Sequence, residues 1–156
     1  MSGFVINLAA LPGGMCRIEL RAAARDLQLP GEQWPGDVRG ALAVDRTGEK
    51  VSVRGRVSTV ARLECARCLK EYEAPLDVEL TVYADRLSSS RRLEHDLERD
   101  EYMKFHDGRQ LDLREDAREA LLLDLPITPH CREECRGLCL KCGTDLNPGP
   151  CACPGS

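Results

Sequence analysis

The sequence predicts an α+β protein: an antiparallel β-meander, one main packed helix, and a cysteine-rich, metal-stapled C-terminal tail. Three observations lead to this fold class. Apolar and polar residues alternate over three consecutive segments, one helical apolar pattern follows them, and six of the nine cysteines lie after residue 126. We therefore expect a β-rich domain at 1–126 and a zinc-binding tail at 127–156 docked on it.

The clearest strand pattern runs from 51 to 64. Apolar residues occupy every second position, with mostly polar residues between them, as in a half-buried strand. A shorter pattern at 38–44 precedes it through the turn-like segment 45–48, and a third at 76–83 follows. Three such segments in sequence order predict an antiparallel meander. Weaker strand patterns occupy 4–8 and 17–23.

The helix is predicted between a charged segment and a proline. Residues 86–110 are polar and suggest a mobile loop or extension, with a short strand at 102–105. Asp112 then suits the N-cap, with Glu115 in the capping-box position, and Pro126 ends the helix. The consecutive leucines Leu121–Leu123 extend beyond a single apolar stripe along the helix, so we expect this helix to be well packed on the sheet.

Composition excludes several classes of protein. The chain has 156 residues, a net charge of −4 and six aromatic residues, too few for a platform that stacks several bases. No apolar run approaches the ~20 residues of a membrane span. No basic residue precedes Arg17, and Asn7 and Pro12 interrupt the apolar N-terminal stretch. We expect no secretory signal, a cytoplasmic location and no membrane partner.

The cysteines carry the strongest chemical signal. Eight of them form close pairs, while Cys16 stands apart. In a reducing compartment such pairs indicate metal ligands before disulfides, and four thiolates match the tetrahedral preference of Zn²⁺. The candidate metal ligands are Cys65, Cys68, Cys131, Cys135, Cys139, Cys142, Cys151 and Cys153.

Eight thiolates suit two four-cysteine sites, and we expect two zinc ions. The four cysteines from 139 to 153 could close a compact ribbon. The pair at 65–68 would then share an ion with the pair at 131–135 and staple the long strand to the segment after the helix. Alternatives are a single ion shared by the pairs 65–68 and 139–142, an iron–sulfur cluster, or His130 in place of a thiolate.

These motifs resemble a known family. The segments Leu63–Leu69, Leu125–Pro129 and Cys135–Cys139, with Cys142–Asn147 and the Cys151-x-Cys153 pair, look like the YceD family of large ribosomal RNA accumulation proteins in bacteria and plastids. The resemblance covers nearly the whole chain. It implies a non-enzymatic role in accumulation or processing of 23S ribosomal RNA and in large-subunit assembly. The implied partner is ribosomal RNA or a ribosome-assembly protein.

A basic stripe offers a candidate RNA contact. Residues 37–72 contain eight basic and five acidic residues, a local charge of +3 in an acidic chain. A solvated sheet face would show the same pattern, so both interpretations stay open. The candidate RNA-binding residues are Arg54, Arg56, Arg62, Arg67 and Lys70.

Enzyme signatures are missing from the sequence. It contains no glycine-rich phosphate loop, no His-Glu-x-x-His and no Gly-x-Ser-x-Gly. We therefore expect a protein without catalytic residues or a small-molecule substrate. Two other functions remain: a zinc-dependent protein–protein adaptor without RNA contact, and a thiol-redox protein. RNA binding predicts salt-dependent affinity, an adaptor predicts nuclease-resistant capture of a partner, and a redox role predicts readily alkylated native thiols.

Overall fold

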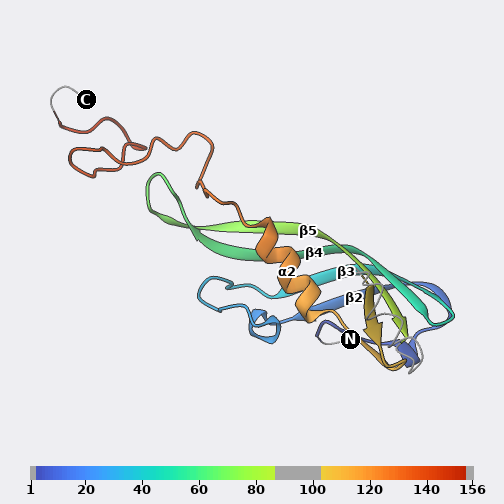
Figure 1. Cartoon of the computed structure of the whole chain (residues 1–156). Helices are drawn as coiled ribbons and strands as arrows, with labels where there is room; N and C mark the ends of the chain where they lie inside the picture. Colours follow the sequence, from blue (N-terminus) through green and yellow to red (C-terminus); the bar gives the residue numbers. More distant parts are fainter. Residues whose placement is uncertain (1–2, 87–102, 154–156) are drawn as a thin grey trace, which may run out of the picture.

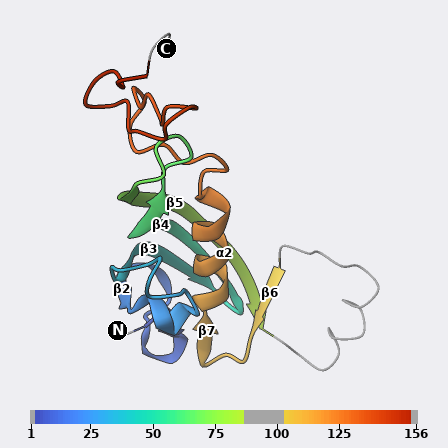
Figure 2. The same cartoon turned by 90° about the vertical axis from the view of Figure 1, so that its left-hand side faces the viewer.

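The computed structural model describes residues 3–86 and 103–153. Its main element is a five-stranded sheet in the order β2-β3-β4-β5-β6, with helix α2 (Arg114–Asp124) against one face (Figures 1 and 2). The sheet strands are β2 (Gly14–Ala22), β3 (Val38–Thr47), β4 (Lys50–Glu64), β5 (Glu71–Arg86) and β6 (Met103–His106). The expected α+β architecture, mostly antiparallel sheet with one main helix, is confirmed.

The alternation in the long strand has the expected structural meaning. Along β4, Val51, Val53 and Val57 are buried, while the basic residues between them are exposed. The turn after β3 comes later than the expected segment 45–48, because Thr47 still pairs with Lys50. Gly48, with φ +63°, opens the resulting two-residue turn, where a left-handed conformation favours glycine.

Four further elements complete the described fold. β1 (Val5–Asn7) pairs with β7 (Gln110–Asp112) in a separate two-stranded sheet, and η1 (Leu8–Ala10) and η2 (Ala24–Leu27) are short 3₁₀ turns. β6 pairs with β5 in parallel, an exception to the meander. The expected loop lies mainly at 87–102, outside the described residues.

The core lies between α2 and the inner face of the sheet. Leu113, Ala117 and Leu121 are fully buried at this interface. Leu122 and Leu123 are instead 37% and 86% exposed, so the helix buries a single stripe rather than the broader surface expected.

The helix starts two residues after the expected N-cap. Asp112 belongs to β7, and the cap position is Leu113, which has no side-chain capping bond. Leu113 is held by the core, and its backbone N–H donates to Phe4 O at 2.7 Å. The Asp112 carboxylate still accepts from Arg114 N at 3.0 Å and pairs with the guanidinium of Arg114. The expected capping box is therefore wrong in position, although Asp112 still accepts from the first helical N–H.

The described tail, residues 127–153, forms no regular strand and contains one isolated bridge, Leu138 to Asp145. It lies beyond the end of the β4–β5 hairpin, opposite the end of the sheet that carries β6 (Figures 1 and 2). The division of the chain at residue 126 stays a prediction. No helix in the described ranges combines the length and apolarity needed to cross a membrane.

Candidate metal centres

The first cluster joins the β4–β5 hairpin to the segment after α2. Cys65 and Cys68 lie in the turn between the strands, and Cys131 and Cys135 follow the helix. The Sγ atoms of Cys65 and Cys135 are 3.7 Å apart, as are those of Cys68 and Cys131, and all four lie within 4.8 Å of one another. A tetrahedral ion with bonds of ~2.3 Å has sulfur–sulfur edges of about 3.8 Å. The cluster therefore has the dimensions of a site for one ion.

Local backbone bonds shape the first turn. Cys65 N donates to Lys70 O, and Leu69 N donates to Cys65 O, both at 2.9 Å. This folding requires a left-handed residue at Leu69, whose φ is +62°. The Arg67 guanidinium donates to Cys135 O at 2.9 Å, which fastens the hairpin turn to the later pair of cysteines.

The second cluster lies within the tail and repeats this turn. Cys139, Cys142, Cys151 and Cys153 also have their sulfur atoms within 4.8 Å of one another. Cys139 N donates to Thr144 O, and Gly143 N donates to Cys139 O, with the same residue offsets as in the first turn. Gly143 has φ +73° at the position that Leu69 occupies in the first turn. The two Cys-x-x-Cys segments therefore adopt the same turn, and each contributes two thiols to its own candidate metal cluster.

Bonds also connect the two clusters. Asn147, between the cysteine pairs of the second cluster, has its Nδ2 3.5 Å from the Sγ of Cys135. Its Oδ1 accepts from Arg136 N at 2.9 Å. Lys70 pairs with Asp145 at 2.5 Å, so the first turn also contacts the loop of the second cluster. The arrangement gives the first cluster supporting contacts from the tail, as metal ligands commonly receive.

Within each cluster, some thiols have a lowered pKa and others a raised pKa. Burial raises the pKa of Cys65, but backbone bonds from Cys68, Cys131 and Arg67 outweigh it and lower the pKa to about 5. The side-chain bond from Asn147 lowers the pKa of Cys135.

In the second cluster, bonds to Thr144 lower the pKa of Cys142 to about 6. In contrast, burial raises the pKa of Cys131 to about 12, and the bond to Cys142 raises that of Cys153 to about 12. Each cluster thus holds one strongly acidified thiol and one thiol that keeps its proton until a metal ion displaces it.

The candidate RNA-binding residues lie at several places. Four of them are engaged within the chain: Arg56 pairs with Asp77, Arg62 with Glu73, Lys70 with Asp145, and Arg67 donates to Cys135 O. Arg54 lies on β4, where it donates to Tyr83 Oη at 2.6 Å and covers the Tyr83 ring at 5.7 Å. Within the described residues Arg54 has no carboxylate partner.

Sequence reasoning missed two exposed arginines on the neighbouring strands. Arg17 on β2 lies outside the basic segment 37–72, and Arg39 on β3 lies within it but was not among the candidates. Neither side chain makes a hydrogen bond or an ion pair among the described residues. The pairing of β2 with β3 brings them to the same face as Arg54. The alternation of apolar and polar residues in β2 indicated that Arg17 faces solvent. It could not show how β2 aligns with β3 and β4.

The four-thiolate clusters suit a structural role for metal. Each offers four protein ligands, so a tetrahedral ion would have no open position for a substrate. Neither His130 nor Cys16 belongs to either cluster among the described residues. In the part of the chain that the structure describes, the pairs 65–68 and 139–142 belong to different clusters.

Comparison with known proteins places the chain in a family. Residues 53–156 match the family model of the large ribosomal RNA subunit accumulation protein YceD. An uncharacterized protein of Mycobacterium leprae is 32% identical over 121 residues, 77% of this chain and 54% of that protein. An uncharacterized protein of Mycobacterium tuberculosis is 35% identical over 112 residues, 70% of this chain and 51% of that protein.

A plant relative has a descriptive name. The chloroplastic large ribosomal RNA subunit accumulation protein YCED homolog 1 of Arabidopsis thaliana is 26% identical over 160 residues, 85% of this chain and 50% of that protein. The chain thus spans about half the length of these relatives. No solved structure matches it. Since the family model covers both Cys-x-x-Cys turns, β5 and most of β4, the chain belongs to the YceD family.

Proposed function

We propose that this protein promotes accumulation of 23S ribosomal RNA, and thereby assembly of the large ribosomal subunit, as a cytoplasmic, non-enzymatic factor that contacts RNA. The observation that carries the proposal is the family match over residues 53–156, which includes all eight clustered cysteines. The name of the Arabidopsis relative refers to the same process.

The metal clusters support a structural rather than a catalytic use of zinc. The 3.7 Å sulfur–sulfur distances in the first cluster match the edge of a tetrahedron around one ion. A four-iron cluster would hold its cysteine sulfurs further apart, because each sulfur binds a different iron. Zinc in both clusters would organise a tail that has no apolar core of its own and fix it at the end of the hairpin.

The decisive experiment is depletion of the protein in its own host. The ratio of 23S to 16S ribosomal RNA and the large-subunit peak in a sucrose gradient should both fall. The wild-type gene should restore them, and a Cys68→Ser variant, which removes a ligand of the first cluster, should not. An unchanged ratio after depletion would contradict the proposed function.

A protein partner is the second candidate, because large apolar side chains lie exposed near the tail. Leu123 is 86% exposed, and Ile127 and Leu140 are fully exposed. Such side chains are typical of contacts with another protein. Affinity capture of an assembly factor that persists after nuclease treatment, together with absence of RNA binding by the purified protein, would favour this alternative.

A further inference from the structure

The strand register builds three rows across the outer face of the sheet, the face opposite α2. In the first row, Arg17 on β2 pairs with Ala43 on β3, which pairs with Arg54 on β4. In the second row, Ala41 lies between Glu19 and Arg56 in the same way. The middle strand therefore presents two alanines between long side chains on both neighbouring strands.

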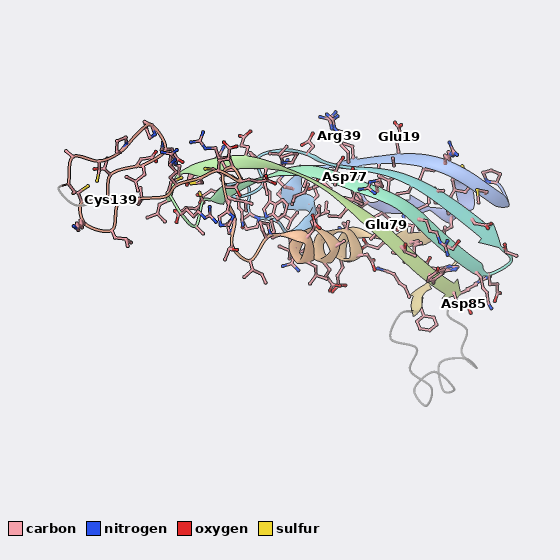
Figure 3. The ribbon with its side chains drawn as sticks, turned by 90° about the horizontal axis from the view of Figure 1, so that it is seen from above. Glu19, Arg39, Asp77, Glu79, Asp85 and Cys139 are labelled. Atoms are coloured by element: carbon pink, nitrogen blue, oxygen red, sulfur yellow. The ribbon has the colours of Figure 1, made fainter. Side chains whose placement is uncertain are left out.

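The third row closes one end of this arrangement. Arg39 on β3 pairs with Arg21 on β2 and with Ser58 on β4. Figure 3 shows Arg39 and Glu19 pointing away from α2, on the side of the sheet that the helix leaves uncovered. The alanines form a low floor, and the charged side chains form its walls and one end.

Two adjoining depressions follow these rows. One, of about 620 Å³, is lined by Arg21, Arg39 and Arg56 among others, and the second, of about 600 Å³, by Arg17 and Arg54. Both include Glu19 and Ala41, so they form one continuous groove. Arg17 and Arg54 lie on β2 and β4, which are separated by one strand, so their backbones are about 9.6 Å apart. A groove of this width fits one extended chain rather than a broad surface.

Three guanidinium groups in the groove have no carboxylate partner among the described residues: those of Arg17, Arg39 and Arg54. In contrast, Arg21 is paired with Asp37 at 2.6 Å and Arg56 with Asp77 at 2.9 Å. A paired arginine must give up its carboxylate before it can bind an anion, whereas a guanidinium without a carboxylate can donate to phosphate directly. Arg54 donates from one nitrogen to the neutral Tyr83 Oη and keeps its other donors.

We propose that this groove binds the sugar–phosphate backbone of a single RNA strand, with Arg17, Arg39 and Arg54 donating to phosphates. The inference rests on the proposed function and names the RNA-contacting surface. Its floor of Ala41 and Ala43 offers neither rings for base stacking nor side-chain donors for base edges, so binding is independent of sequence. Arg56, held by Asp77, shapes the wall of the groove.

The test uses the full chain and a fluorescein-labelled single-stranded RNA of ~16 nucleotides in mixed sequence. The groove variant carries Arg17→Gln, Arg39→Gln and Arg54→Gln. The matched control carries Arg25→Gln, Arg109→Gln and Arg132→Gln, which removes the same charge from exposed positions outside the groove. Thermal unfolding and metal content establish that both variants are folded.

Affinity is measured by fluorescence anisotropy over a range of salt concentrations. The groove variant should bind more weakly, and its slope of log K against log salt should be smaller by about 2, because three phosphate contacts are lost. The control should keep a slope close to that of the wild type. Equal loss in the groove and control variants would show a dependence on net charge alone and would overturn the groove assignment.

Two further outcomes separate this inference from the proposed function. Wild-type RNA binding that the groove variant retains in full would overturn the groove while leaving an RNA-binding function intact. Tighter wild-type binding of an oligoglutamate peptide than of the RNA would identify an acidic protein as the occupant and overturn the assignment to RNA. Neither result would change the outcome of the depletion experiment, so the proposed function in 23S accumulation would be tested separately.

Discussion

The side chain of Asn147 reaches from the loop of the second metal cluster to the first, with its Nδ2 3.5 Å from Cys135 Sγ. The same amide accepts from Arg136 N through Oδ1. Asn147 thereby lies in the outer shell of one cluster while belonging in sequence to the other. We therefore expect metal binding at the two candidate centres to be interdependent.

Replacement of Asn147 tests that interdependence. Asn147→Ala should weaken metal binding at the first cluster by roughly 10- to 100-fold, since supporting bonds to a ligand commonly have this effect. Competition with a chromogenic chelator measures it, with Asn7→Ala as a control because Asn7 lies far from both clusters in sequence. Unchanged affinity in Asn147→Ala would show that the contact does not stabilise the bound ion.

Ligand substitutions should separate the two clusters by their effects. The first cluster joins segments more than sixty residues apart, so Cys68→Ser should lower the free energy of unfolding by more than about 4 kcal/mol and loosen the end of α2. Cys142→Ser should disorder the tail while the sheet still unfolds cooperatively. Thermal unfolding and hydrogen exchange compare them. A sheet that melts equally early in both variants would argue against separate roles.

Metal analysis provides the stoichiometry. Protein purified under reducing conditions should contain about two zinc ions per chain, because two four-thiolate clusters are present. Elemental analysis measures the metal directly. In Cys142→Ser the content should fall to about one, and in Cys16→Ser it should remain at two. Iron in place of zinc would contradict the proposed metal.

Metal affinity should increase with pH. Cys131 and Cys153, with pKa values raised to about 12, carry protons at neutral pH when metal is absent, and binding must release them. The logarithm of the apparent affinity should therefore rise by at least about 1 per pH unit at each cluster between about pH 6 and 8. Chelator competition across this range checks the slope. A pH-independent affinity would show that binding displaces no proton.

Gly55 should be intolerant of any side chain. A Cβ at this position would lie 2.1 Å from Ala41 O and 2.8 Å from Leu42 Cα, both backbone atoms of β3. Gly55→Ala should therefore lower the free energy of unfolding by about 3 kcal/mol, through displacement of β3. Chemical denaturation measures the loss. Gly31→Ala is the matched control: its Cβ would meet nothing within 4 Å, and its stability should change little.

Prediction from sequence succeeded where one local pattern decides the structure. The alternation around Val53 and Val57 determines which face of β4 is buried, because a strand repeats every two residues. The spacing of the cysteines similarly favoured the two groups that the structure brings together, although it left their pairing open.

The sequence could not reveal features that depend on distant contacts. The parallel direction of β6 and the three-residue pairing of β1 with β7 leave no local signature. Arg17 and Arg39 join Arg54 on one face only through the register of β2, β3 and β4. In the sequence, Asn147 has the features of an ordinary loop residue, and only the fold brings it beside Cys135.

The pairing of β3 with β4 limits where the chain can be truncated to make a stable fragment. The family match begins at residue 53, but β4 pairs with β3 from Arg39 through Thr47. A recombinant fragment restricted to residues 53–156 would leave one side of β4 without its neighbouring strand, and unpaired strand edges promote association between molecules. The start of the family match is therefore a poor place to cut this chain, and residues 14–47 belong in any fragment meant to keep β4 paired on both sides.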